Sequence, residues 1–310
     1  MAVAQKYLVI SPCRDEATLM CRTMESVLRQ TVPPDLWIVV DDGSTDETPR
    51  ILAEYAQRIP YLRVLRRDNR GRRSVGPGVV EAFYAGYREV NPRGFDYLCK
   101  LDLDLELPPT YFEQLIQRME AEPRLGTCSG KPFYPGPEGQ PISEGCGDEM
   151  SVGMTKFYRT ACFQEIGGFV PAVMWDGIDC HRCRMLGWSA RSFDEPGLRF
   201  LHLRPMGSSQ EGILEGRWRH GEGQWFMGTG LLYVTASALY RTTRRPFLTG
   251  ALAMWLGYLA SMLAGKPRYA DLEFRTFLRG FQLECLLLGK HRATWNVERR
   301  KAGHLRGAGS

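Results

Sequence analysis

The sequence predicts an α/β domain with a mainly parallel sheet flanked by helices, followed by a C-terminal helical region. Four short apolar runs alternate with segments whose apolar residues recur at helical spacing, which is typical of such a sheet. The apolar runs are 7–10, 37–40, 61–65 and 95–101, and the helical segments are 19–28, 47–55 and 79–90. The 310 residues are 44% hydrophobic and 24% charged, an ordinary globular composition that excludes a disordered, collagen-like or coiled-coil chain.

Polar residues follow three of the predicted strands at the points where the strands end. Pro12 follows the first strand, Asp41 and Asp42 follow the second, and the segment 102–104 follows the fourth. Ligands of parallel sheets bind outside the carboxyl ends of the strands, so we expect these groups to converge on one crevice. The segment 44–47, Ser-Thr-Asp-Glu, is typical of a cap that opens the next helix.

The chain beyond residue 106 is less regular. Helices are predicted over 111–119 and 177–187, and a Gly- and Pro-rich loop over 130–147 is expected to help form a second binding site. The predicted organisation is a main domain over 1–210, a helical region over 211–298 and a flexible tail over 299–310. The main domain divides into halves of about 1–106 and 107–210.

The nine cysteines show no regular spacing, and their number is odd. We therefore expect reduced thiols of a cytosolic protein rather than a disulfide framework. Cys180 and Cys183 form a Cys-x-x-Cys without the second pair that is usual in a zinc site. The first twelve residues hold one Lys and then enter the first strand, so no secretory leader is expected.

The string Asp-Leu-Asp at 102–104 has the chemistry of a divalent-cation site. Residues two apart share a face in strand geometry. Their carboxylate oxygens suit Mg²⁺ or Mn²⁺, which keep open positions for phosphate. Taken alone, the string is also typical of a solvated strand end, and it lacks the glycine and distal Glu of an EF-hand loop.

The string Asp-Asp-Gly-Ser-Thr-Asp-Glu-Thr at 41–48 has two interpretations. Carboxylates at the crevice can accept hydrogen bonds from a ribose or a base edge. The same residues also fit a capped turn between strand and helix without any ligand. This string alone does not decide between the two.

Together, the ordered strings resemble the nucleotide-sugar glycosyltransferases of family two, inverting enzymes with a Rossmann-like fold of the GT-A type. The matching pieces are SPCRDE at 11–16, VVDDGSTDET at 39–48, KLDLDLE at 100–106, and GGF at 167–169 followed by MWDGIDCHRCRMLGW at 174–188. Their order and approximate spacing match the family over roughly residues 5–205.

The resemblance implies a nucleotide-sugar donor, most often a UDP-sugar in this family, and a divalent cation, Mg²⁺ or Mn²⁺. The ion would neutralise charge on the leaving diphosphate. The implied donor-binding residues are Pro12, Arg14, Glu16, Asp41, Asp42, Arg72, Arg73, Lys100 and Asp102. The implied metal ligands are Asp102, Asp104 and His202. For His202, the alternative is a histidine whose hydrogen bonds are satisfied within the protein core or at the surface. For most arginines of the basic loop 66–73, the alternative is a solvated surface loop.

The resemblance also implies a general base that deprotonates the acceptor hydroxyl. The family places this Asp six residues before an Arg, with a Gly-aromatic pair five residues after the Arg. Arg182 and Gly187 fix that frame and point to Asp176, with Asp179 as the alternative. Trp175 stands where the family commonly has Glu, which is a departure. Either Asp also fits a favourable charge at a helix N-terminus.

The C-terminal third predicts contact with a membrane surface. The runs 223–240 and 246–265 are uncharged, and residues 211–310 hold 15 Lys and Arg against 7 Asp and Glu. This pattern suits insertion at a membrane interface, with a buried helical subdomain as the alternative. We expect a peripheral or monotopic protein on the cytoplasmic face of the cell membrane that does not bind nucleic acid. A polyprenyl-diphosphate-linked glycan is the expected acceptor.

Two features predict the addition of a single sugar. The Gln-x-x-Arg-Trp string of processive family members is incomplete at Arg217-Trp218, and the chain has no multi-span region. Two other functions stay open: a nucleotidyltransferase, which typically needs a Gly-rich loop with Lys near the N-terminus, and a non-catalytic nucleotide-sugar-binding scaffold, which Trp175 keeps open.

Overall fold

The computed structural model describes residues 5–71, 76–204, 212–243 and 246–307, with side chains as far as Lys301. The chain divides into two compact units. The sheet unit comprises residues 1–171 and 189–205, and the helical unit comprises residues 172–188 and 206–310. The sequence predicts one main domain over 1–210, whereas this division groups the segment 172–188 with the C-terminal helices.

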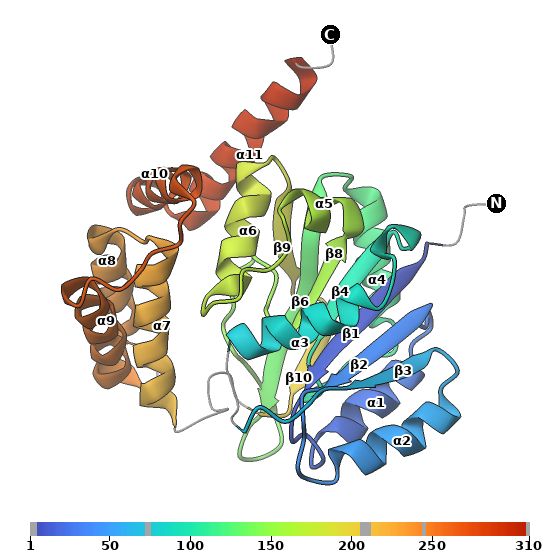
Figure 1. Cartoon of the computed structure of the whole chain (residues 1–310). Helices are drawn as coiled ribbons and strands as arrows, with labels where there is room; N and C mark the ends of the chain where they lie inside the picture. Colours follow the sequence, from blue (N-terminus) through green and yellow to red (C-terminus); the bar gives the residue numbers. More distant parts are fainter. Residues whose placement is uncertain (1–4, 72–75, 205–211, 244–245, 308–310) are drawn as a thin grey trace. The chain divides into compact units, whose positions relative to one another are not determined.

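The sheet unit contains one mixed sheet, whose described strands are ordered β3-β2-β1-β4-β8-β6-β10-β5, with β7 and β9 also paired to β6 (Figure 1). The strands are β1 (Tyr7–Cys13), β2 (Leu36–Asp41), β3 (Leu62–Arg66), β4 (Tyr97–Leu101), β5 (Leu105–Glu106), β6 (Leu125–Pro135), β7 (Pro141–Ser143), β8 (Thr155–Arg159), β9 (Ser189–Phe193) and β10 (Arg199–His202). Strands β3, β2, β1 and β4 are parallel, as predicted. Beyond β4 the sheet is mixed, because β8 runs antiparallel to both β4 and β6.

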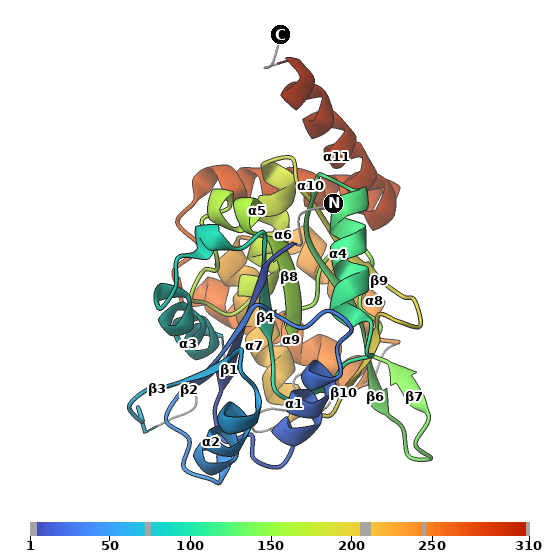
Figure 2. The same cartoon turned by 90° about the vertical axis from the view of Figure 1, so that its right-hand side faces the viewer.

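Helices cover both faces of this sheet, and Figure 2 shows α3 and α4 on opposite sides of the central strands. The helices of the sheet unit are α1 (Met20–Leu28), α2 (Thr48–Arg58), α3 (Pro77–Arg88), α4 (Tyr111–Ala121), α5 (Thr160–Glu165) and a 3₁₀ turn (Pro92–Gly94). Tyr7, Val9 and Trp37 are fully buried in the core shared with α1, α2 and α4. The Tyr7 and Phe112 rings lie 5.1 Å apart, which ties β1 to α4.

The opposite face of the sheet is packed against α3 at short range. A Cβ atom at Gly86 would lie 2.9 Å from Val40 Cγ2 and 3.1 Å from Ile10 Cγ2, so glycine permits this close approach. Phe83 of the same helix packs its ring 4.8 Å from that of Phe169. The two packed faces fix the parallel strands, and their carboxyl ends reach the same edge of the sheet.

The predicted strands and helices of the first hundred residues are all present, with small shifts at their ends. The prediction of a continuous loop over 130–147 is wrong. Strand β6 extends to Pro135, and β7 pairs back onto it with Pro141 opposite Pro135. Proline weakens a strand pattern in the sequence, yet it is tolerated at sheet edges and strand ends.

The helical unit consists of α6 (Trp175–Met185), α7 (Ile213–Met227), α8 (Leu231–Arg241), α9 (Phe247–Leu263), α10 (Leu272–Leu288) and α11 (Lys290–Gly307). The predicted C-terminal helices are therefore present. Residues 299–307, predicted as part of a flexible tail, continue α11. Among the described residues, no helix is both long and apolar enough to cross a membrane.

Helices α7 and α9 cross at close range within the helical unit. A Cβ atom at Gly221 would lie 1.9 Å from the Met254 carbonyl oxygen, and one at Gly257 would lie 2.4 Å from the Trp218 carbonyl oxygen. The uncharged run 246–265 forms α9, while Gly228, with a φ of 94°, ends α7 and separates it from α8. Gly221 and Gly257 therefore allow the two helices to pack closely, and Gly228 allows α7 to end.

Candidate active site

Two loops at the carboxyl edge of the sheet are fastened to each other by hydrogen bonds. The Asp15 N–H donates to Ser44 Oγ over 2.9 Å, and the Glu16 N–H donates to Thr48 Oγ1 over 2.9 Å. Ser44 thus joins the two loops, and in the segment 44–47, predicted to cap the next helix, it is Asp46 that accepts an N–H of α2. The Thr48 N–H at the start of α2 donates to Asp46 Oδ1.

Asp41 and Asp42 lie at the end of β2, as predicted, but in different surroundings. Asp42 Oδ1 accepts hydrogen bonds from Arg67 Nη1 and Arg70 Nη2, each over 2.7 Å. Asp41 is buried, and its Oδ2 atom has no hydrogen-bond partner among the described residues. Arg66 Nε lies 3.7 Å from that oxygen. Asp42 is therefore neutralised within the chain, whereas Asp41 offers a buried acceptor.

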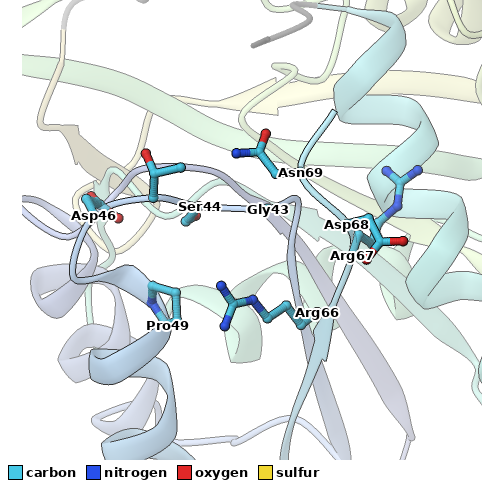
Figure 3. A pocket seen from close by; sticks show the side chains of 9 residues that line it. Gly43, Ser44, Asp46, Pro49, Arg66, Arg67, Asp68 and Asn69 are labelled. Carbon is cyan, nitrogen blue, oxygen red and sulfur yellow. The ribbon is translucent and has the colours of Figure 1, made fainter. Parts of the chain in front are cut away.

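A hollow of about 480 Å³ lies between the turn after β2 and the loop after β3 (Figure 3). Residues 43–46, Pro49 and 66–69 line it. Gly43 has a φ of 75°, and a Cβ atom there would lie 2.4 Å from Asn69 Cα, so the two loops can meet only at a glycine. Arg14 ties them further, since its Nη1 donates to the Asp42 carbonyl oxygen over 2.9 Å and its Nη2 to Asn69 Oδ1 over 2.7 Å. The polar lining of the hollow suits a polar ligand.

Lys100 is buried in β4 and holds the first carboxylate of the Asp-Leu-Asp string. Its Nζ contacts Asp102 Oδ1 and donates to the Gly153 carbonyl oxygen over 2.9 Å. The Asp102 N–H donates to the Met154 carbonyl oxygen over 2.8 Å. Lys100 therefore orients Asp102 from within the sheet.

The second carboxylate of the string, Asp104, lies among cations from the end of β10. Arg204 Nε lies 3.3 Å from Asp104 Oδ2, and His202 Nε2 lies 3.7 Å from the same oxygen. Arg204 also pairs with Glu16, which belongs to the loop after β1. Asp104 Oδ1 is buried and has no hydrogen-bond partner among the described residues. Cations thus compensate the charge at Oδ2 of Asp104, while Oδ1 has no such partner among the described residues.

The electrostatics of Asp104 and His202 follow from this pairing. Burial would raise the pKa of the Asp104 carboxyl, but the neighbouring His202 and Arg204 cations hold that pKa below its usual value. Burial likewise opposes the charged form of His202, but the carboxylates of Asp104 and Glu144 outweigh it and raise the pKa of His202 to about 9. Each group therefore stabilises the charge on the other.

The donor set at Asp104 fits a hard divalent cation that arrives with a phosphate ligand. The described residues contain no group of three or more His, Cys, Asp or Glu side chains placed to hold an ion by themselves. Mg²⁺ is commonly held by one or two carboxylates, with substrate phosphates and water completing its shell. The Oδ1 atom of Asp104, which has no hydrogen-bond partner among the described residues, is such a carboxylate oxygen. Asp102 lies two residues before Asp104 in the sequence, and His202 Nε2 lies 3.7 Å from the other oxygen of Asp104.

Comparison with known proteins identifies the family of this chain. Residues 8–168, about half of the chain, match the family model described as glycosyl transferase family 2. The chain belongs to this family. The strings at 39–48 and 100–106 lie inside the matched region.

Curated relatives share the N-terminal part of the chain. An uncharacterized glycosyltransferase, YibD, of Escherichia coli is 30% identical over 116 residues, which are 37% of this chain and 31% of the relative. A poly-beta-1,6-N-acetyl-D-glucosamine synthase of Staphylococcus epidermidis is 26% identical over 121 residues, 39% of this chain and 27% of the relative. The aligned segments thus span less than a third of these relatives' own lengths.

Solved structures show the same fold over nearly the whole chain. A Pyrobaculum calidifontis mannosyltransferase, solved with GDP-Man and Mn²⁺, has a TM-score of 0.54 and 17% identity, covering 97% of this chain and 87% of its own. Staphylococcus aureus TarS, solved with UDP-GlcNAc, has a TM-score of 0.52 and 13% identity, covering 98% and 92%. The predicted GT-A fold is therefore confirmed, as is the predicted glycosyltransferase family.

The remaining predicted residues of this family 2 member fall in different parts of the chain. Asp176 and Asp179 lie on α6 of the helical unit; Asp176 is in its first turn and Asp179 is buried. Their roles stay predictions. Pro12 pairs with Val40 between β1 and β2. Arg72 and Arg73, which the sequence predicts to bind the donor, lie outside the described residues.

Glu144 is a residue of the site that the sequence does not predict. Its carboxylate lies 3.1 Å from His202 Nδ1, although 58 residues separate the two. No local signal marks this residue, because it sits in a Gly- and Pro-rich stretch after β7. Only the pairing of β7 and β10 with β6 brings the two side chains together.

The raised pKa of His202 predicts a specific pH dependence of stability in the metal-free protein. A histidine whose pKa is about 9 when folded and 6.5 when unfolded stabilises the fold fully below about pH 6.5. This contribution, of the order of 3 kcal/mol, is lost as the pH rises to about 9. Urea unfolding with a chelator should therefore show that His202→Gln destabilises the protein strongly at about pH 6 and weakly at about pH 9.5. An equal loss at both pH values would contradict the assigned charge of His202.

Proposed function

We propose that this family 2 glycosyltransferase transfers one sugar from a nucleotide-sugar to an acceptor hydroxyl, with inversion at the anomeric carbon and with a divalent cation, Mg²⁺ or Mn²⁺. The observation that carries this proposal is the Asp104 carboxylate. It lies among cations at the carboxyl edge of the sheet and keeps one buried oxygen without a hydrogen-bond partner among the described residues. Such an oxygen suits a divalent ion that is also bound by the diphosphate of the donor.

A UDP-sugar is the proposed donor. The buried Oδ2 of Asp41 offers an acceptor to an N–H group of the base. Arg66 and Arg67, which line the hollow beside it, supply positive charge for a nucleotide. The mannosyltransferase and TarS structures were solved with GDP-Man and with UDP-GlcNAc, which supports a nucleotide-sugar without choosing the base.

Asp102, Asp104 and His202 are the proposed holders of the ion, which would neutralise the charge that builds on the leaving diphosphate. Asp176 is the proposed general base. It takes the proton of the acceptor hydroxyl while the oxygen attacks the anomeric carbon and the bond to the diphosphate breaks, which inverts the configuration. Asp179 is the alternative, but it is buried and its Oδ1 accepts the Cys180 N–H, so Asp176 is better suited to reach a substrate.

A lipid-linked glycan is the proposed acceptor, reached by a peripheral or monotopic protein on the cytoplasmic face of the cell membrane. Helix α9 supports this with a row of exposed leucines, Leu248, Leu252, Leu256 and Leu263. At 100° per residue they fall in a sector about 80° wide. The buried residues of α9, such as Met254 and Tyr258, lie on the other side.

The charge pattern around this row of leucines suits an anionic membrane. The chain has no Asp or Glu between Glu222 and Asp271, while the same stretch contains several Arg and Lys residues. Leucine side chains at the interface and basic side chains at the head groups are the two contributions that hold a monotopic helix on a membrane. The poly-beta-1,6-N-acetyl-D-glucosamine synthase among the relatives supports a role in polysaccharide synthesis.

The donor site predicts metal-dependent stabilisation by one nucleotide. In a thermal-shift panel of UDP, GDP, dTDP and CDP, each with and without Mn²⁺, UDP with Mn²⁺ should give the largest rise in Tm. A ligand at 100 times its Kd stabilises the folded state by roughly 2.7 kcal/mol. Asp104→Asn keeps the size of the side chain but removes its charge, so it should abolish the part of the shift that depends on Mn²⁺.

Glu89→Gln is the matched control, since it removes an exposed carboxylate at the end of α3 and should respond as the wild type does. A larger shift with GDP would change the donor and keep the rest of the proposal. No response of the wild type to any nucleotide would contradict the proposed function. Nucleotide binding without sugar transfer to any lipid acceptor would favour the scaffold function instead.

The exposed face of α9 predicts binding to vesicles that contain phosphatidylglycerol. In a flotation assay the full chain should rise with the vesicles, and Leu248→Glu/Leu252→Glu should reduce the bound fraction by about tenfold or more, because each leucine contributes about 1.5–3 kcal/mol on burial. Leu272→Glu, at a leucine of similar exposure at the start of α10, is the control and should float normally. Equal flotation of all three proteins would contradict the assignment of this face.

A further inference from the structure

Glu144 and His202 face each other across β6, although neither residue belongs to that strand. Ser143 of β7 pairs with Phe133, and the Glu144 N–H donates to the Pro132 carbonyl oxygen over 3.1 Å. On the other side of β6, Phe200 of β10 pairs with Pro132. Figure 2 shows the strands β6, β7 and β10. Paired residues share a face of a sheet, and so do residues two apart on one strand. Glu144 and His202 therefore extend from the same face.

The carboxylate of Glu144 holds the imidazole of His202 by both of its oxygens. His202 Nδ1 lies 3.1 Å from Oε1 and 3.2 Å from Oε2 of Glu144. Only 5% of the Glu144 side chain and 9% of the His202 side chain are exposed. A carboxylate can only accept here, so Nδ1 carries the proton that it donates to Glu144.

The loop that carries Glu144 is itself anchored to the sheet. Lys131 of β6 is buried, and its Nζ donates to the Cys146 carbonyl oxygen over 2.7 Å and pairs with Asp148 Oδ1 over 2.7 Å. The segment 144–148 is thus fixed at both its start and its end. The hairpin therefore fixes the backbone position from which the Glu144 side chain contacts His202.

The direction of the imidazole follows from this contact. Since Nδ1 is engaged by Glu144, the other ring nitrogen, Nε2, points towards Asp104, whose Oδ2 lies 3.7 Å away. A histidine that binds a metal ion commonly donates its second N–H to a carboxylate, which fixes the ring orientation and makes the free nitrogen more basic. The contacts of His202 follow this pattern beside a carboxylate that keeps one oxygen unpartnered among the described residues.

We propose that Glu144 is a positioning residue: it holds His202 through Nδ1 so that Nε2 faces the divalent cation at Asp104. This inference rests on the proposed function, because it assigns Glu144 a part in that same metal site. Glu144 acts through His202 and touches neither the ion nor the donor. Its loss should weaken metal binding while leaving the nucleotide hollow, between β2 and β3, unchanged.

The contact itself is tested first, without any metal. In ¹⁵N-edited NMR spectra of the full chain with a chelator, the Nδ1–H proton of His202 should be protected from exchange with water in the wild type. It should stay protected in Glu144→Gln, whose amide oxygen can still accept, and become exchangeable in Glu144→Ala. An equally protected proton in Glu144→Ala would overturn the proposal.

Metal binding is tested next, by electron paramagnetic resonance of free Mn²⁺ during titration in the presence of UDP. Glu144→Ala should bind Mn²⁺ about 10–100-fold more weakly than the wild type, the usual effect of losing such a partner, and Glu144→Gln should lose less. The Kd for UDP without metal should not change. Glu138→Ala, at an exposed position of the same hairpin, is the control and should bind Mn²⁺ normally.

A double-mutant cycle separates positioning from a general effect on folding. If Glu144 acts through His202, Glu144→Ala should cause no further loss of Mn²⁺ affinity in a His202→Ala background. A loss of the same size in both backgrounds would overturn the proposal. Normal Mn²⁺ binding by Glu144→Ala would overturn the positioning role alone, whereas a wild type that binds no Mn²⁺ with UDP would contradict the proposed function as well.

Discussion

A carboxylate that leaves water loses several kcal/mol of solvation unless cations or hydrogen bonds replace it, and the site is organised around this constraint at Asp104. His202 and Arg204 supply the positive charge. They are held in turn by Glu144 and Glu16, so that opposite charges alternate along the five side chains. This arrangement compensates one oxygen of Asp104, while the other has no hydrogen-bond partner among the described residues. The requirement of that oxygen for a positive partner links the fold to the proposed metal chemistry.

The strand β10 makes this arrangement possible. The parallel strands β3, β2, β1 and β4 bring together the loops that line the hollow, and β4 adds the charge of Lys100. Among the described residues, the two cations that lie within 4 Å of Asp104, His202 and Arg204, come from the end of β10. Strand β10 lies between β6 and β5 in the sheet, and the Leu203 N–H that follows it donates to the Asp104 carbonyl oxygen over 2.8 Å. His202 and Arg204, on either side of Leu203, are thereby brought to the carboxylate. The mixed half of the sheet thus completes a site that the parallel half begins.

The parts of this account that depend on local sequence could be predicted. The apolar strands and the polar residues at their ends follow from short patterns, which place Asp41, Asp42 and Asp104 at one edge of the sheet. Features that depend on distant pairing could not be predicted. Ser44 is typical of a helix cap, yet Asp15 from another loop engages it. Glu144 shows no signal, because its role arises from the pairing of three strands.

The division of the chain into two units also depends on packing, which the spacing of apolar residues in the sequence does not indicate. The segment 172–188 reads as part of the main domain, since it lies between segments of the sheet unit in the sequence. In the structure its helix α6 is grouped with the C-terminal helices. Arg182 Nη1 donates to the Tyr269 hydroxyl over 2.9 Å, a contact between residues 87 positions apart. Such contacts join segments that are far apart in the sequence, so a pattern of neighbouring residues cannot indicate them.

The central claim is that Asp104 holds a divalent cation together with the diphosphate of a nucleotide. Anomalous diffraction at the manganese edge, from crystals grown with Mn²⁺ and UDP, tests it most directly. The account predicts a manganese peak at Asp104, with His202 facing the ion and the diphosphate oxygens completing its shell. A nucleotide bound in the hollow between β2 and β3 with no manganese at Asp104, while Arg204 keeps its place against that carboxylate, would contradict the account.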